Sequence, residues 1–195
     1  EQFRKAMRRE VLVGAEISGA LKKGEEILSG YYECYKNEFS KPMFLEYSFR
    51  THNVYLENVP LTGKLDRIDM IEPVQRKVSI VDYKTGKPRS RNEIEGKTKY
   101  SDGRYKRQLN FYKILCESDQ LFPFDVSSGE FDFIEPMPSG KHKKERFEFS
   151  QNELSELRGL ILKTYSGIRE HKFGKTDDVS KCKNCDYKDI CERSA

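Results

Sequence analysis

Two kinds of hydrophobic pattern alternate along the chain. Apolar residues recur at three- and four-residue spacings in residues 1–39, 105–118 and 152–173, which is typical of helices with one buried face. Short β-branched, aromatic or alternating runs occupy residues 44–84 and 129–150, where we expect an antiparallel meander and then a strand pair. Four glycines are expected to interrupt the first helical region, at positions 14, 19, 24 and 30. The pattern predicts an α/β (α+β) fold.

The segment GKLDRIDMIEPVQRKVSIVDYKTGK, residues 63–87, predicts its own strand register. A hairpin that turns at residues 72–76 would pair two apolar couples and then two acids: Met70 with Val78, Ile68 with Ile80, and Asp66 with Asp82. Opposed residues of an antiparallel pair project from one face of the sheet, and Lys84 follows on that face. A hairpin slipped by one residue would instead leave both acids solvated at the strand ends.

In the first register, Asp66 and Asp82 would repel each other unless a cation lay between them. Carboxylate oxygens favour a hard divalent cation, Mg²⁺ or Mn²⁺, which keeps water ligands for the phosphate oxygens of a substrate. Lys84 could orient or help to deprotonate the attacking water and offset charge in the transition state. The backbone carbonyl of Tyr83 could also reach the metal. This arrangement indicates a metal-dependent phosphodiesterase.

Three motifs, GKLDRID, VDYKTGK and QLNFY, resemble in their order and spacing the signature of RecB-type nucleases of the PD-(D/E)XK superfamily. The resemblance is best over residues 40–115. It implies a restriction-endonuclease-like core with a central mixed β-sheet flanked by helices, Asp66 and Asp82 as metal ligands, and Lys84 as the catalytic lysine. Family members commonly add a metal-binding histidine on an upstream helix, whereas the histidines here lie at positions 52, 142 and 171.

Three further residues match the family pattern. Gln108 and Tyr112, four apart on one helix face, match its Gln-x-x-x-Tyr motif, which implies that they reach the active site or the DNA backbone. The alternative is a surface glutamine and a core tyrosine. Glu46 in FLEYSF matches an acidic residue on the strand before the Gly-x-x-Asp motif and would orient the site. Its alternative is an exposed strand glutamate.

The distribution of charge along the chain is more informative than the total charge. The formal net charge is only +4, which does not by itself indicate a nucleic-acid partner. Residues 84–107, the basic segment, nevertheless contain nine basic and three acidic side chains. This segment is either a solvated loop or a surface that contacts the DNA backbone. The candidate DNA-binding residues within it are Lys87, Arg89, Arg91, Arg104 and Arg107.

Three cysteines near the C-terminus, Cys182, Cys185 and Cys191, follow the pattern C-x2-C-x5-C. The spacing is similar to the tail of the iron–sulfur subset of these nucleases, including AddB-type and CRISPR-associated exonucleases. It implies a 4Fe-4S cluster whose fourth ligand is not identified in this chain. A thiolate-bound zinc and three unligated cysteines are the alternatives. Cys34 is the upstream candidate, in an apparent helix nearer the core than the pattern implies.

Together these features predict a Mg²⁺-dependent deoxyribonuclease, an exonuclease domain that acts in DNA repair or recombination. We expect a nuclease domain over residues 1–175, with a helical segment over 1–39, and a cysteine-bearing tail over 176–195. The charged start without Met is expected of a fragment of a longer helicase-nuclease, the C-terminal part of a UvrD-like or AddAB-like helicase. DNA and a helicase are the expected partners, and a small-molecule substrate is not expected.

Other classes of function remain open. One is a catalytically inactive DNA-binding or scaffolding module with a nuclease-like fold, which retention of Asp66, Asp82 and Lys84 argues against. Another is a protein-interaction module organised by a metal at the cysteines. The sequence has neither an apolar run long enough to span a bilayer nor a signal-like N-terminus, so we expect a cytoplasmic, nucleoid-associated protein rather than a membrane protein.

Overall fold

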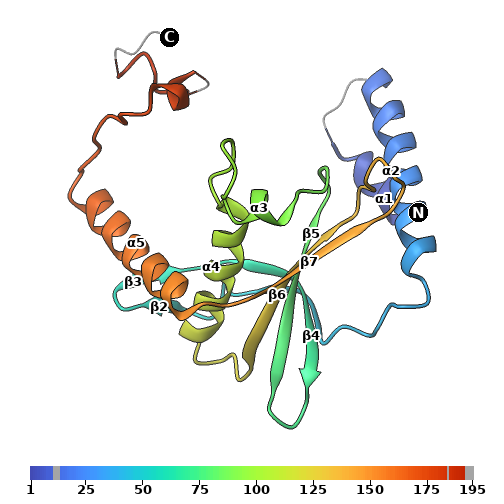
Figure 1. The fold of residues 1–195 in the computed structure, drawn as a ribbon, viewed down its shortest axis with the longest axis horizontal. Helices are drawn as coiled ribbons and strands as arrows, with labels where there is room; N and C mark the ends of the chain where they lie inside the picture. The colour runs from blue at the N-terminus through green and yellow to red at the C-terminus, as the bar shows by residue number, and fades with distance from the viewer. Residues whose placement is uncertain (11–13, 184, 192–195) are drawn as a thin grey trace. The chain divides into compact units, whose positions relative to one another are not determined.

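The computed structural model describes residues 1–10, 14–183 and 185–191. It divides into two compact units, Glu1–Leu157 and Arg158–Ala195 (Figure 1). The first unit contains the sheet and the strands that carry both candidate acids. The second contains the end of helix α5 (Gln151–Arg169) and a short 3₁₀ turn, η1 (Val179–Cys182). None of the described helices is long and apolar enough to cross a bilayer.

A five-stranded mixed sheet forms the centre of the first unit, in the order β1–β4–β5–β6–β7. Its strands are β1 (Phe44–Ser48), β4 (Lys64–Glu72), β5 (Lys77–Lys84), β6 (Asp125–Phe133) and β7 (Lys143–Glu148). Neighbouring strands are antiparallel except β5 and β6, which run parallel and are joined by a helical crossover. The predicted mixed sheet with flanking helices is therefore confirmed.

The β4–β5 hairpin has the predicted register, and its Cα partners include Met70–Val78 and Ile68–Ile80. Ile68 and Ile80 are fully buried, so a slip by one residue would move them to the other face of the sheet. Continued toward the open end of the hairpin, this register sets Asp66 opposite Asp82. The expected meander is interrupted by a hairpin that forms its own two-stranded sheet, β2 (Val54–Leu56) and β3 (Val59–Leu61).

The N-terminal region forms two helices, α1 (Gln2–Met7) and α2 (Gly14–Tyr35). The expectation that glycines interrupt this region was wrong for α2, which continues through positions 19, 24 and 30. Gly24 has a packing reason, because a Cβ there would lie 2.2 Å from the ring of Phe3. Glycine costs a helix about 1 kcal/mol relative to alanine, and the packing of Phe3 from α1 against Gly24 offsets that cost in α2.

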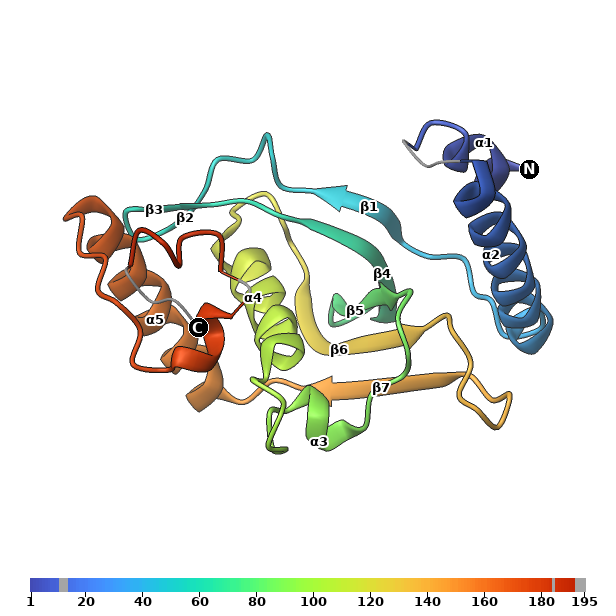
Figure 2. The same ribbon diagram turned by 90° about the horizontal axis from the view of Figure 1, so that it is seen from above.

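Helix α4 (Arg104–Ser118) covers one face of the sheet, and the strands separate it from α2 on the other side (Figure 2). Two glycines let α4 lie close to the strands. A Cβ at Gly63, just before β4, would be 2.7 Å from a methyl carbon of Leu115, and one at Gly129 in β6 would be 3.0 Å from Leu109. Both leucines are fully buried and have little room to move. Gly63, the glycine of the Gly-x-x-Asp motif, therefore determines how closely α4 can pack over the strand that carries Asp66.

The basic segment joins β5 to α4 and contains one helical turn, α3 (Arg91–Ile94). Ser90 and Glu93 form a capping box at the start of this turn. At its end, Ile94 is fully buried in a cluster with Leu109, Phe131, Phe133 and Phe147. The segment is thus anchored to the core at its middle, whereas the sequence was compatible with a free loop.

Candidate active site

Two acids lie at the open end of the β4–β5 hairpin, where α4 crosses the sheet. Asp82 is on the central strand β5 and is only 3% exposed, because strands lie on both sides of it and α4 covers it. Asp66 on β4 is half-buried. The alternative of a slipped hairpin with both acids solvated is thereby excluded.

Three side chains converge on the Asp82 carboxylate. The Gln108 amide nitrogen donates to Asp82 Oδ1 (2.9 Å), and its carbonyl oxygen accepts from Lys84 Nζ (2.8 Å). The Tyr112 hydroxyl also donates to Asp82 Oδ1 (3.1 Å). Lys84 Nζ lies 2.5 Å from Asp82 Oδ2, the oxygen that accepts no hydrogen bond of normal geometry. The structure therefore brings these four predicted residues together.

The electrostatics of this group follow from its burial. Burial raises the pKa of Asp82 above its usual value and the charge of Asp66 adds to this, while Lys84 and the Tyr112 hydroxyl oppose it. Burial, followed by the charge of Asp82, raises the pKa of Tyr112, so its hydroxyl stays protonated as a donor. A buried carboxylate with a raised pKa is poorly solvated, and a cation or a proton would stabilise it.

Asp66 is held by the backbone of the opposite strand. The Tyr83 N–H donates to Asp66 Oδ2 (2.9 Å), while the Tyr83 hydroxyl accepts from Arg67 (3.2 Å). Tyr83 therefore contributes its backbone N–H to the Asp66 side of the hairpin, whereas the contact predicted from the sequence was between its backbone carbonyl and a metal.

Glu46 on β1 lies opposite Asp66 on the adjacent strand β4, because the β1–β4 register pairs its neighbours Leu45 and Tyr47 with the neighbours of Asp66. Acids from three strands thus occupy one row of the sheet: Glu46, Asp66 and Asp82. The Glu46 backbone is left-handed (φ 54°), and its 62% exposed carboxylate pairs with Lys64. The register aligns the three acids, but their carboxylates are not gathered around one point.

The donor set around Asp82 can be tested for its fit to a metal ion. No group of three or more His, Cys, Asp or Glu side chains in the described residues is placed to hold a metal. Mg²⁺, however, typically takes one or two carboxylates together with several waters. Asp66 and Asp82 meet that requirement, and Asp82 Oδ2 is a buried oxygen whose neighbour in this structure is the cation of Lys84, 2.5 Å away, rather than a hydrogen-bond donor of normal geometry. The residues present fit a hard divalent cation.

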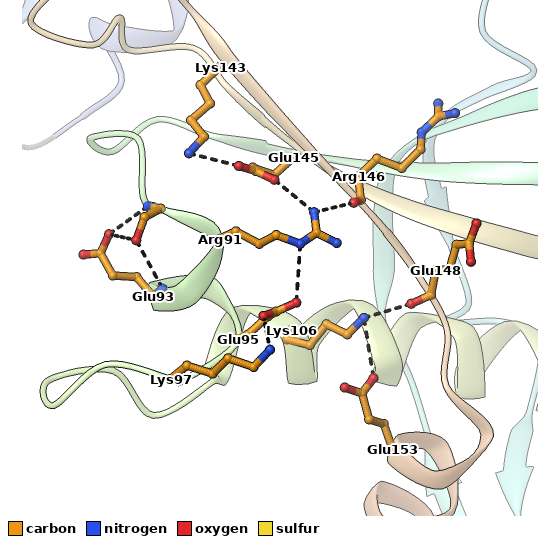
Figure 3. Close-up of polar contacts among 11 residues, drawn as sticks. Arg91, Glu93, Glu95, Lys97, Lys106, Lys143, Glu145, Arg146, Glu148 and Glu153 are labelled. Carbon is orange, nitrogen blue, oxygen red and sulfur yellow. Dashed lines mark hydrogen bonds and ion pairs between the residues drawn. The ribbon is translucent and has the colours of Figure 1, made fainter.

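The basic segment divides into paired and unpaired cations. Arg91 belongs to the first kind: it donates to Glu145 (3.1 Å) and to the carbonyl of Arg146 (3.0 Å) and lies over the Phe147 ring (4.2 Å to the centroid). Figure 3 shows Arg91 at the centre of this network between α3 and β7. Its guanidinium is therefore occupied within the protein.

Other candidate DNA-binding residues are less occupied. Arg107 lies 3.9 Å from Asp102, a long contact between exposed groups. Lys87, Arg89 and Arg104 pair with no acid in the described parts of the chain. The structure separates Arg91 from the other predicted contacts and leaves these three cations available.

The cysteines lie in the second unit. Cys182 is buried in it, and Cys185 and Cys191 are half-buried. All three are free thiols and, over the described ranges, they do not form a metal-holding group. Cys34 is exposed on α2 in the first unit. The expected cluster has no assembled ligand set among these residues.

Sequence reasoning missed two features. Tyr105, one helical turn before Gln108, places its ring 5.0 Å from Lys84 Nζ. On the other face of the sheet, the Tyr31 hydroxyl donates to the buried Asp132 (2.5 Å). The three-residue spacing of Tyr105 and Gln108 was a usable signal for the first. The second joins residues 101 positions apart, for which the sequence carries no local signal.

Comparison with known proteins places these observations in a family. The model of the PD-(D/E)XK nuclease superfamily matches residues 1–192. No curated protein matches the chain. Among solved structures, that of SSO0001 aligns with a TM-score of 0.45 and 14% sequence identity, over 93% of this chain and 75% of that chain.

Proposed function

Because this chain belongs to the PD-(D/E)XK nuclease superfamily, whose members are generally metal-dependent nucleases, we propose that it hydrolyses phosphodiester bonds at the Asp82 group. The observation that carries the proposal is the contact of Asp82 with Lys84, Gln108 and Tyr112. Lys84 lies two positions beyond Asp82 on the same strand, and Asp66 is held by the N–H of Tyr83, the residue between them. A site of this composition suits the cleavage of an anionic ester.

Each residue has a distinct role in the proposed reaction. Lys84 is a catalytic residue that holds a proton next to the reacting phosphate and stabilises its negative charge. Gln108 is a positioning residue, because it fixes the lysine and the carboxylate through its two amide atoms. Tyr112 supports Asp82 by a second hydrogen bond to the same oxygen.

Asp66 and Asp82, with the Tyr83 carbonyl, would hold the Mg²⁺ or Mn²⁺ that family members typically use. When bound, such an ion supplies an activated water and offsets phosphate charge. The residues of this chain orient the carboxylates for that purpose: the Tyr83 N–H fixes Asp66, and Gln108 with Tyr112 fixes Asp82. Glu46, paired with Lys64, is proposed to orient the site from the neighbouring strand.

We propose DNA as the substrate, exonuclease action in repair or recombination as the role, and association with a helicase. The basic segment supports a polyanionic substrate, since contacts to the phosphate backbone depend on charge and not on sequence. Mg²⁺ specificity, deoxyribose specificity and a location at the nucleoid belong to the same proposal. A catalytically inactive DNA-binding module is the second candidate, favoured by the lack of a third metal-ligating side chain in the described residues.

The iron–sulfur cluster is a separate proposal for Cys182, Cys185 and Cys191. It is supported by their C-x2-C-x5-C spacing. Iron, sulfide and zinc analysis of the chain purified without oxygen tests it. Iron with acid-labile sulfide supports the cluster, and zinc supports the alternative of a thiolate-bound zinc. If neither metal is found, the three thiols are unligated.

The nuclease proposal is tested by degradation of end-labelled linear DNA with Mg²⁺ or Mn²⁺. Asp82→Ala and Lys84→Ala are expected to abolish cleavage with folding unchanged by circular dichroism. Asp177→Ala and Lys175→Ala, at exposed positions of the second unit, are the matched controls and should retain it. If the unaltered chain binds DNA without cleaving it in any metal, the binding-module candidate replaces the nuclease.

A further inference from the structure

Tyr105, at the start of α4, is surrounded by cations. Lys84 Nζ lies 5.0 Å from the centre of its ring, the Arg89 guanidinium 5.2 Å and the Arg104 guanidinium 5.6 Å. The ring itself rests edge-to-face on Phe131, 5.4 Å between centroids. An aromatic face attracts cations, so the ring offsets part of the repulsion between three like charges held close together.

Among the described residues neither arginine forms a close ion pair, although each is near enough to an acid to add to the hydrogen bonds that lower the pKa of that acid, Arg89 to Glu93 and Arg104 to Asp102. In the part of the chain that the structure describes, Arg89 and Arg104 form no ion pair with Asp or Glu. Their neighbours Arg91 and Lys106 both do, with Glu145 and Glu153 respectively. The segment therefore pairs the cations that build its frame, and of the three cations around Tyr105 it leaves Arg89 and Arg104 without a close ion pair to a described residue, whereas Lys84 pairs with Asp82.

The frame also fixes the backbone at Arg89. Lys143 donates to the Arg89 carbonyl (2.9 Å) and pairs with Glu145 (3.0 Å), which in turn holds Arg91. Figure 3 shows Lys143, Glu145 and Arg91 as consecutive members of this network. The backbone that presents the Arg89 side chain is thus held on both sides of Ser90, which makes the arginine a preorganised contact.

We propose that Arg89 and Arg104, held by Tyr105, form a phosphate-binding subsite that adjoins the reaction centre. It would take the nucleic-acid phosphate next to the one being cleaved, because Lys84 contacts both the Tyr105 ring and Asp82. Guanidinium groups suit this ligand, since their planar donors match two phosphate oxygens. The subsite rests on the proposed nuclease function for the identity of its ligand, and Tyr105 is its positioning residue.

Salt dependence of binding tests the subsite without cleavage. A fluorescent oligonucleotide, single-stranded or duplex, is titrated in EDTA at several salt concentrations. Arg89→Gln and Arg104→Gln should each reduce the slope of log K against log salt by about 0.7 for a single strand or about 0.9 for a duplex, as loss of one phosphate contact predicts. Arg76→Gln, in the turn between β4 and β5, is the matched control and should leave the slope unchanged.

Tyr105 variants separate positioning from packing. Tyr105→Phe keeps the ring and should bind like the unaltered chain, whereas Tyr105→Leu should weaken binding in the same sense as the arginine variants. Unchanged slopes in both arginine variants, with thermal unfolding unaltered, overturn the subsite, and so does an unaltered chain that binds no nucleic acid.

The same experiment keeps the two proposals apart. Cleavage with unchanged slopes retains the nuclease function and rejects the subsite. Reduced slopes in a chain that never cleaves retain the subsite and reject the nuclease function.

Discussion

Two buried aspartates on neighbouring strands offer a natural comparison. Asp82 on β5 and Asp132 on β6 are 3% and 2% exposed, and each accepts a hydrogen bond from a tyrosine hydroxyl, Tyr112 and Tyr31 respectively. Burial raises the pKa of both carboxyls. Because Asp132 is paired in register with Tyr83, it projects from the opposite face of the sheet.

The surroundings of the two acids differ. Asp82 faces an acid across the hairpin and contacts Lys84 and Gln108, whereas Asp132 is 3.6 Å from Lys144 and connects the sheet to α2 through Tyr31. Burial and a raised pKa are thus common to both and do not identify a reactive site. The facing carboxylate, the lysine and the bridging amide distinguish the first, while the second acts as an attachment point for a helix.

The largest expected difference is in activity. Asp82→Asn should lower DNA cleavage by about 100-fold or more, because it removes a charge that the reaction centre requires. Asp132→Asn keeps an oxygen that can accept a hydrogen bond from Tyr31. Because Asp132 lies on the other face of the sheet, this variant should cleave DNA within about twofold of the rate of the unaltered chain. Initial rates on labelled linear DNA, at saturating Mg²⁺, measure both. Equal losses of activity in the two variants would mean that the reaction does not depend on which face of the sheet carries the aspartate.

The next largest difference is in stability. Tyr31→Phe should lower the free energy of unfolding by about 1–3 kcal/mol, because it leaves a buried carboxylate without its hydroxyl donor. Tyr112→Phe should cost less, since Gln108 still donates to the same oxygen of Asp82, yet it should slow cleavage by about 10-fold. Urea unfolding and cleavage rates of both variants check that Tyr31→Phe costs more stability and that Tyr112→Phe costs more activity. A greater loss of stability in the Tyr112 variant would contradict it.

The smallest effect is on pH dependence. Because the folded-state pKa of Asp132 lies above its ordinary value of 3.8, the folded protein binds this proton more tightly than the unfolded chain does. The contribution of this proton to the free energy of unfolding is complete below about pH 4 and is lost as pH rises through the folded-state pKa of Asp132. Asp132→Asn should therefore become relatively more stable, compared with the unaltered chain, as the pH of urea titrations is raised from about pH 4 through the folded-state pKa. A stability difference that does not change with pH would mean that the carboxyl titrates normally.

The sequence predicted most of the fold around Asp82 because the evidence was local. Alternating apolar residues set the register of one hairpin, and the spacing of Gln108 and Tyr112 set one helix face. What it could not predict depends on long-range contacts. The continuity of α2 through Gly24 depends on Phe3, twenty-one positions earlier in the chain. The division of the basic segment likewise depends on Glu145, from a distant strand.

The left-handed backbone of Glu46 affects how readily another strand could add to the β1 edge of the sheet. β1 is an edge strand of the five-stranded sheet, and Leu45 on it is largely exposed. A regular edge presents a row of unpaired N–H and C=O groups to which a strand of another molecule can add. The turn of the backbone at Glu46 interrupts that row, and its carboxylate and Lys64 put charge beside it. The residue opposite Asp66 on β1 thus also makes this edge a less regular template for the addition of another strand.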